Sequence, residues 1–339
     1  MLESPQHVAL AIMTRGGATE SVHYGSVAVA DAEGNLLHSA GDPHAPMFTR
    51  SSLKPFQAMP VLASGADRAY GFGDRELALM CASHSGEARH VDVVSGMLRR
   101  IGCTADDLQC GKHAPYFYQY LEQTPEPGAT FSTVHHNCSG KHSGMLAYCR
   151  HCGQEVGSYL DQRHPLQQAI RRSVAHFTGT AEANLIVGTD GCSAPNYAVP
   201  LSGLARAFAK LAAARADPEY GDAPARLFEA MSANPELVSG ERRNDLALMQ
   251  TGQGDWATKV GAEGMQGIAV RSRGWGVAIK IADGNARALF PVTVAVLQQL
   301  GLLDDPRATP LRMYFEPPQH NLRGIVTGKI QPVVELRAG

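Results

Sequence analysis

The sequence lacks the long apolar run that a membrane-spanning protein needs. Hydrophobic residues make up 44% of its 339 residues, but no apolar run approaches the roughly 20 residues that cross a bilayer. The formal net charge is only −2, which gives no electrostatic reason to expect nucleic acid or an anionic membrane as a partner. The opening stretch MLESPQHVALAIMTRGG lacks the basic and apolar regions of a secretory signal peptide. We therefore expect a cytoplasmic enzyme.

The sequence is also poor in the features of disulfide-rich proteins and of common zinc hydrolases. It contains seven cysteines, an odd number in a chain that is not small. It has no H-E-x-x-H motif and no other convincing cluster of His and Asp ligands. We expect free thiols, with metal binding by some of them as the alternative.

Strand-like patterns lie at the two ends of the chain. VHYGSVAVA and NLLHSAG flank a DAEG turn, GIAVRS and GWGVAIKIAD flank Arg273-Gly274, and IVTGKIQPVVEL offers a last strand. Between them, segments such as PLQQAIRRSVAHFTG carry apolar residues at helical spacing. This predicts an α+β fold, or α/β sandwich, whose sheet comes from the N- and C-terminal segments. We expect one two-lobed catalytic domain over 1–339, with a sheet lobe of about 1–50 plus 255–339, a helical lobe of about 51–254 and a ligand cleft between them.

The segment RSSLKPFQAMP contains a serine and a lysine three residues apart, Ser51 and Lys54. If the segment opens a helix, the two side chains lie on one face, and a neutral lysine can take the serine's proton. Pro55 is compatible with a first helical turn. The structural alternative is a serine cap beside a solvated lysine.

Two further segments offer polar side chains to the same chemistry. Ser83 lies in CASHSGE between two helical patterns, where it is either a helix cap or a second hydroxyl for proton relay. His84 and Glu87 are acid–base candidates to which no role is assigned. Lys259 precedes a glycine-rich turn in TKVGAEG and is either a surface lysine or a partner of Ser83.

Cys138 and Cys192 occur in similar settings, NCSGKH and DGCS, which look like loops leading into helices. A helix N-terminus favours the thiolate, and two thiolates with a third donor suit zinc. Lys141 or His142 can supply that donor, and the residues alone do not decide between them. Catalysis by Cys138 is an alternative, as is metal binding by the pair Cys149 and Cys152.

Five segments taken together resemble the asparaginase II family, the thermolabile rhizobial-type L-asparaginases. They are RSSLKPFQ (50–57), CASHSGE (81–87), HHNCSGKHSGML (135–146), GTDGCSAPNY (188–197) and KVGAEG (259–264). They follow in order over most of the chain. The resemblance implies a fold similar to that of serine β-lactamases and glutaminases, which agrees with strand-rich ends around a helical middle.

The resemblance also implies two catalytic Ser–Lys pairs, Ser51 with Lys54 and Ser83 with Lys259. Lys259 is anchored only by the short KVGAEG segment.

The family's zinc site, in which one ion lies beside the serine, maps onto Cys138, Lys141 and Cys192. Zinc there is expected to have a structural or substrate-orienting role. A lysine ligand must be neutral, which requires a large fall from its ordinary pKa.

The resulting hypothesis is hydrolysis of the L-asparagine side-chain amide to L-aspartate and ammonia through an acyl-enzyme on Ser51. Arg50 and Asp190 are candidates for the substrate's α-carboxylate and α-ammonium groups, and His142 completes the substrate-binding set. Family resemblance alone implies a homodimer. The choice between asparagine and glutamine stays open, because one methylene is worth only about 1–3 kcal/mol.

Three other functions compete with this hypothesis. A glutaminase-like, β-lactamase-like or peptidase-like acyl hydrolase would use the same Ser–Lys chemistry. A metal-dependent amidohydrolase would use zinc-bound hydroxide. A non-enzymatic amino-acid-binding protein would bind asparagine without turnover.

Overall fold

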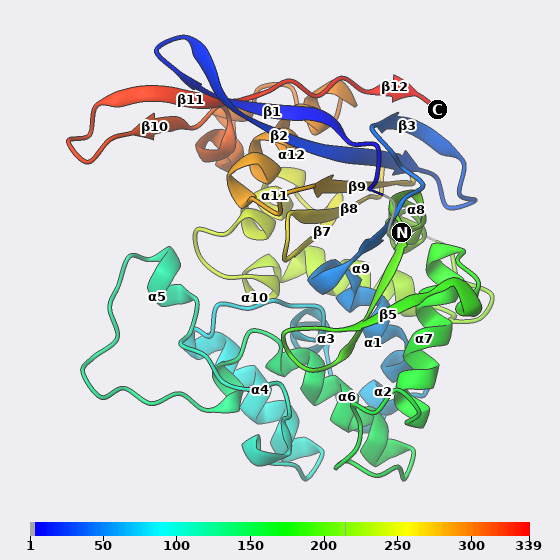
Figure 1. Cartoon of the computed structure of the whole chain (residues 1–339). Coiled ribbons are helices and arrows are strands. Elements are labelled where there is room, and N and C mark those ends of the chain that lie inside the picture. Colours follow the sequence, from blue (N-terminus) through cyan, green and yellow to red (C-terminus); the bar gives the residue numbers. More distant parts are fainter. Residues whose placement is uncertain (1–3, 214) are drawn as a thin grey trace.

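The structure, a computed structural model, describes residues 4–213 and 215–339. Its main sheet joins the two ends of the chain, because β1 near the N-terminus pairs antiparallel with β11 near the C-terminus. Figure 1 shows these blue and red strands side by side. In spatial order the sheet contains β10 (Pro318–His320), β11 (Val326–Pro332), β1 (Val8–Arg15), β2 (Ala18–Ala30), β9 (Trp275–Ile281), β8 (Met265–Val270) and β7 (Trp256–Gly261), and β3 (Leu36–Ala40) pairs with both β2 and β12 (Arg337–Ala338).

The strands bury both of their faces, with different side chains on each. In β2, Val27 and Val29 belong to one hydrophobic core, whereas Ala28 and Ala30 belong to the other. Because side chains alternate across a strand, the branched residues face α12 (Ala286–Gln299) and the small residues face α8 (Leu201–Ala212). The small face allows close packing: a Cβ on Gly276 in β9 would lie 1.8 Å from the Ala205 carbonyl of α8.

The middle of the chain forms the helical lobe. It contains a small antiparallel sheet of β4 (Pro46–Phe48), β6 (Pro195–Pro200) and β5 (Ile186–Thr189). The remaining helices are α1 (Lys54–Ala63), α2 (Ala66–Ala69), α3 (Asp74–Met80), α4 (Ala88–Arg100), α5 (Phe117–Tyr120), α6 (Ser139–His151), α7 (Pro165–Thr178), α9 (Ala223–Ala233), α10 (Pro235–Val238) and α11 (Asn244–Gly252). The short 3-10 helices are η1 (Arg50–Leu53), η2 (Ala105–Asp107), η3 (Thr133–His135), η4 (Glu182–Asn184), η5 (Pro306–Ala308) and η6 (Pro310–Tyr314).

The predicted α+β class and the sheet built from both chain ends are confirmed. Both predicted hairpins are present, as β2–β3 and β8–β9. The segment predicted as the helical lobe also contains two strands, β5 and β6, which the sequence analysis did not predict. The predicted sheet lobe includes residues 1–3 and the predicted helical lobe includes residue 214, all of which lie outside the described residues. No helix in the described part of the chain has the length and apolar character needed to cross a membrane.

Candidate active site

Ser51 and Ser83, 32 positions apart in the sequence, line one cavity of about 300 Å³. Ser51 lies in η1, and Ser83 follows α3 in the loop before α4. The β7–β8 turn closes another side through Gly261 and Glu263. The two serine segments identified from the sequence thus reach the same space between the sheet and the helical lobe.

Ser51 follows a residue with unusual backbone geometry. Arg50 has φ +50°, a left-handed conformation that costs energy for a residue with a side chain. Asn196 of β6 holds it on both sides: its Oδ1 accepts from the Arg50 N–H at 3.0 Å, and its Nδ2 donates to the Arg50 carbonyl at 3.1 Å. This clamp fixes the direction in which Ser51 leaves the small sheet.

Gly261, in the KVGAEG segment, lets β7 approach η1 closely. A Cβ at this position would lie 2.7 Å from the Thr49 carbonyl oxygen and 3.3 Å from the Ser52 nitrogen. A larger residue would therefore push the Ser51 segment away from the sheet. The glycine is a packing requirement of the site.

Lys54, in the first turn of α1, is completely buried and faces Ser83. Its Nζ donates to the Ser83 Oγ at 2.9 Å and also to the Ala82 carbonyl. Among the described residues, no hydrogen bond joins Ser51 to Lys54 or Ser83 to Lys259. The structure therefore brings the four predicted residues to one region, whereas their pairing stays a prediction.

Lys259 is also completely buried, on β7. Its Nζ donates to the Val260 carbonyl at 2.7 Å and lies 3.6 Å from Asp245 Oδ2. Asp245, buried in α11, accepts hydrogen bonds from the Thr258 hydroxyl at 3.0 Å and the Gln266 amide at 3.1 Å. Burial lowers the pKa of Lys259 to about 7, although Asp245 acts to raise it. Lys259 can therefore exchange a proton near neutral pH.

The three predicted metal ligands also converge. Cys138, Lys141 and Cys192 are all buried, and Lys141 Nζ donates to Cys192 Sγ at 3.1 Å. The Cys138 thiol donates toward Cys192, and this contact is the main reason that the pKa of Cys192 is lowered. Burial acts to lower the pKa of Lys141, but the neighbouring Cys192 thiolate, with Cys138 beside it, outweighs this effect and raises that pKa.

These residues form a set of donors that suits zinc: two sulfurs and one amine in a buried site. A further nitrogen, His142 Nε2, is buried without a hydrogen-bond partner. Within the described residues, no three His, Cys, Asp or Glu side chains are grouped to hold a metal. That finding does not bear on this set, because its third donor is a lysine.

The predicted substrate-binding residues lie apart from the serine cavity. Arg50 Nε donates to Asp190 Oδ1 at 2.8 Å, so these two charges already neutralise each other. His142 is buried on α6, where its Nδ1 lies 2.7 Å from the Tyr159 hydroxyl. None of the three lines the cavity that holds Ser51 and Ser83.

The remaining candidates from the sequence have structural surroundings. His84 is fully buried, its Nε2 lies 2.9 Å from Ser139 Oγ, and burial keeps its pKa well below the ordinary value. Glu87 accepts from the Glu241 N–H at 3.0 Å at the start of α4. All seven cysteines are free, as expected, and Cys149 is buried whereas Cys152 is exposed.

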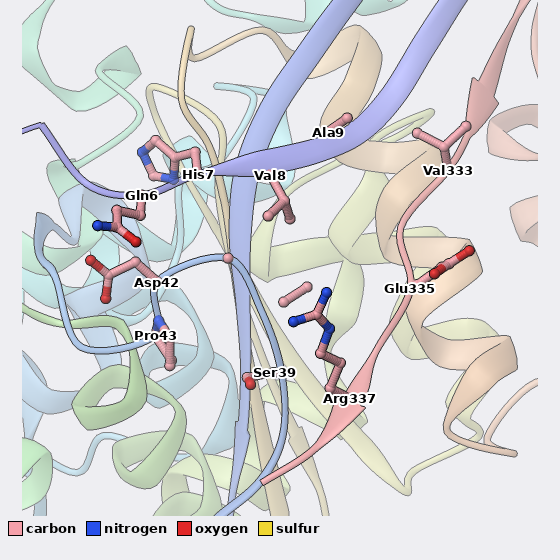
Figure 2. A pocket seen from close by; sticks show the side chains of 12 residues that line it. Gln6, His7, Val8, Ala9, Ser39, Asp42, Pro43, Val333, Glu335 and Arg337 are labelled. Atoms are coloured by element: carbon pink, nitrogen blue, oxygen red, sulfur yellow. The ribbon is translucent and has the colours of Figure 1, made fainter.

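Roomier cavities hold neither serine. One, of about 690 Å³, lies between β1 and the C-terminal strand, where His7, Asp42 and Arg337 surround it (Figure 2). Another, of about 480 Å³, is lined by Arg50 and Glu263 among others. The chemistry of the side chains, and not cavity size, therefore identifies the serine cavity as the candidate active site.

A profile of the L-asparaginase II family matches residues 11–332. The chain belongs to the L-asparaginase II family. No curated protein matches the sequence.

Solved structures resemble the chain only distantly. Mglu in its native form is 15% identical with a TM-score of 0.46, over 83% of this chain and 66% of Mglu. Mglu in its native form in 4.3 M NaCl is 16% identical with a TM-score of 0.38, over 83% of this chain and 62% of Mglu. The match thus spans less than two thirds of the Mglu chain, and nothing about the reaction of this protein follows from it.

The sequence analysis missed three residues of the site: Asn196, Arg243 and Asp245. Asn196 lies inside the quoted GTDGCSAPNY segment, so the motif contained it without showing its role. Arg243 and Asp245 come from ERRNDL, which reads as a charged, exposed helix start. Both are buried, and no local signal distinguishes them from their exposed neighbour Arg242.

Proposed function

We propose that the protein is an L-asparaginase, which hydrolyses the side-chain amide of L-asparagine to L-aspartate and ammonia through an acyl-enzyme on serine. The family supports an amide hydrolase. The observation that carries the proposal is the meeting of two serines at one cavity, with the fully buried Lys54 donating a hydrogen bond to one of them, Ser83. A glutaminase-like or other acyl hydrolase is the alternative.

In the proposed acylation, Ser51 is the nucleophile. Ser51 Oγ forms a bond to the amide carbon while its proton passes to neutral Lys54. The C–N bond breaks, and the leaving nitrogen takes a proton through Ser83 and Lys259 to depart as ammonia. The contact between Lys54 Nζ and Ser83 Oγ supports a connected proton path between the two pairs.

Deacylation reverses the direction of the proton transfer. A water gives one proton to the neutral Lys259–Ser83 pair and attacks the ester carbonyl, and the ester oxygen returns to Ser51 with a proton from Lys54. A pKa near 7 allows Lys259 to accept and release this proton at neutral pH. Asp245 positions Lys259 in both steps.

We further propose that Cys138, Lys141 and Cys192 hold one zinc ion. Lys141, whose Nζ contacts Cys192, is kept as the proposed third donor, and it would have to release its proton to bind the ion. Zinc bound there would join the start of α6 to the loop before β6 and orient the site. The free Cys138 and Cys192 side chains face each other and not the cavity, which does not favour Cys138 as nucleophile.

Asp190 and His142 remain proposed contacts for the substrate, whereas the Arg50 side chain already binds Asp190. A cytoplasmic location and a homodimer also remain proposals, drawn from the sequence and the family resemblance.

The test is ammonia release from L-asparagine and L-glutamine by the wild type and by the Ser51→Ala and Ser83→Ala variants. We expect release from asparagine, its loss in Ser51→Ala and a slower rate in Ser83→Ala, with melting temperatures unchanged. Near-normal activity of Ser51→Ala with loss in Ser83→Ala would assign the nucleophile to Ser83. Release from neither amide by a folded wild type with zinc would overturn the proposed reaction.

A further inference from the structure

The serine cavity contains a buried cation that has no carboxylate partner. Arg243, which precedes α11, lines the cavity and is only 5% exposed. No ion pair joins it to any residue that the structure describes. Glu263 is the one acidic residue among those lining the cavity in the described chain, and it is 69% exposed and lies 3.9 Å from Arg50.

The hydrogen bonds of Arg243 leave much of its guanidinium unused. Nη1 donates to the Ser83 carbonyl. Nε is buried without a partner, and Nη2 makes no hydrogen bond within the described residues. The rings of Tyr120 and Tyr116 lie 4.8 Å and 5.8 Å from the guanidinium carbon, which offsets only part of the cost of burying the charge. The guanidinium therefore has no counter-charge among the described residues.

We infer that Arg243, rather than Arg50, binds the α-carboxylate of the amino-acid substrate. An arginine binds a carboxylate through two parallel hydrogen bonds, and Arg243 has free N–H groups for this whereas Arg50 already binds Asp190. Because Arg243 also holds the Ser83 carbonyl, a carboxylate bound to it lies beside the two serines. This inference rests on the proposed function. Binding of the carboxylate by Arg243 would make the site prefer amides that carry an α-carboxylate.

The test compares two substrates that differ only in this group. L-Asparagine has the α-carboxylate, whereas 3-aminopropanamide has the same amide and amine without it. We expect Arg243→Gln to lower kcat/KM for asparagine about 10- to 100-fold while changing that for 3-aminopropanamide much less. If Arg243 acted only by holding the Ser83 carbonyl, Arg243→Gln would lower kcat/KM for the two substrates equally. That result would overturn the inference.

Arg271 provides a matched control. It also stacks on an aromatic ring, with its guanidinium carbon 3.9 Å from the centre of Phe228, and has buried nitrogens without partners, but it does not line the cavity. Arg271→Gln should leave the preference for asparagine unchanged. If Arg243→Gln does not fold, Arg243→Lys keeps a donor for the Ser83 carbonyl, loses the two-point contact and should show the same change to a smaller degree.

A binding measurement separates this inference from the proposed reaction. Calorimetry with L-aspartate needs no turnover, and we expect binding to the wild type that is weakened about 10- to 100-fold in Arg243→Gln. Failure of the wild type to release ammonia would overturn the reaction but leave this measurement decisive. Equal L-aspartate affinity in the wild type and Arg243→Gln would overturn the inference even if the enzyme hydrolyses asparagine.

Discussion

Replacing Asp245 by asparagine tests whether Lys259 carries the proton that the leaving nitrogen takes. The change removes the one carboxylate beside Lys259 Nζ, at 3.6 Å, and keeps the side chain's size. Other charges that act on Lys259 come from Lys54 and Arg243, which lower its pKa, and from Cys138, which raises it. Without Asp245 the ammonium form loses its main stabilising partner. We expect the pKa of Lys259 to fall below its present value of about 7.

The expected fall in the pKa of Lys259 follows from the distance between its Nζ and the Asp245 carboxylate. Two unit charges 3.6 Å apart at an effective dielectric constant of about 20 interact by about 4–5 kcal/mol. Since about 1.4 kcal/mol corresponds to one pKa unit, the upper limit is about 3 units. Asparagine keeps a dipole at the same place, so we expect a fall of about 1–3 units.

The pH dependence of kcat/KM for ammonia release measures this fall. In the proposed acylation Lys259 must be protonated, so kcat/KM in the wild type should decline as pH rises through about 7, the pKa of Lys259. In Asp245→Asn the decline should move about 1–3 pH units lower. Thr258→Val is the control, because it removes a hydrogen bond to the same carboxylate but not the charge. A basic limb in Asp245→Asn that coincides with that of the wild type would refute this role of Lys259.

Stability provides a second readout with a defined sign. The pKa of Lys259 is about 7 in the folded protein, against 10.5 for an unperturbed lysine side chain such as that of the unfolded chain. Between these pH values the unfolded chain binds more protons at this position, so the free energy of unfolding should rise with pH. The difference corresponds to about 5 kcal/mol between the two ends of the window. Lys259→Met, which has no proton to exchange, should lose this rise.

Two further predictions concern the zinc ligands and the Ser51 segment. Cys192→Ala should lose bound zinc by elemental analysis, whereas Cys149→Ala, outside the proposed site, should keep it; zinc loss in both or neither would contradict the ligand set. Asn196→Ala removes both hydrogen bonds that hold the left-handed Arg50 backbone, so it should lower unfolding stability by about 1–3 kcal/mol and reduce kcat more than KM. Unchanged kcat in that variant would show that the clamp does not position Ser51.

Much of the architecture could be predicted because it depends on local patterns. The valine and alanine alternation of 27–30 specifies a strand buried on both faces, and the turn residues around Arg273-Gly274 define a hairpin. The quoted segments also brought Ser51 and Ser83 to one cavity, as expected of residues that share a catalytic role. Each of these features depends on the pattern of a few neighbouring residues.

The electrostatic partners could not be predicted, because they depend on contacts between distant segments. Asp245 reaches Lys259 only when α11 packs on β7, and Asn196 reaches Arg50 only when β6 pairs beside β4. The ion pair of Arg50 with Asp190 spans 140 positions and changes which arginine is free to bind a carboxylate. Residue type alone suggested Arg50, but only the folded chain shows that Arg243 is the unpaired one.

The charges around the cavity suggest why one lysine has to give up its proton. Lys54, Lys259 and Arg243 are all buried, and Asp245 is the single buried carboxylate that contacts any of them within the described residues. Arginine retains its proton throughout the accessible pH range, so the effects of burial and of repulsion between these charges lower the pKa of Lys259 instead. Lys259 is lowered to about 7 even with Asp245 beside it. An incoming α-carboxylate at Arg243 would add a second negative charge and favour protonation of a nearby lysine. Substrate binding itself would then help supply the proton that departing ammonia requires.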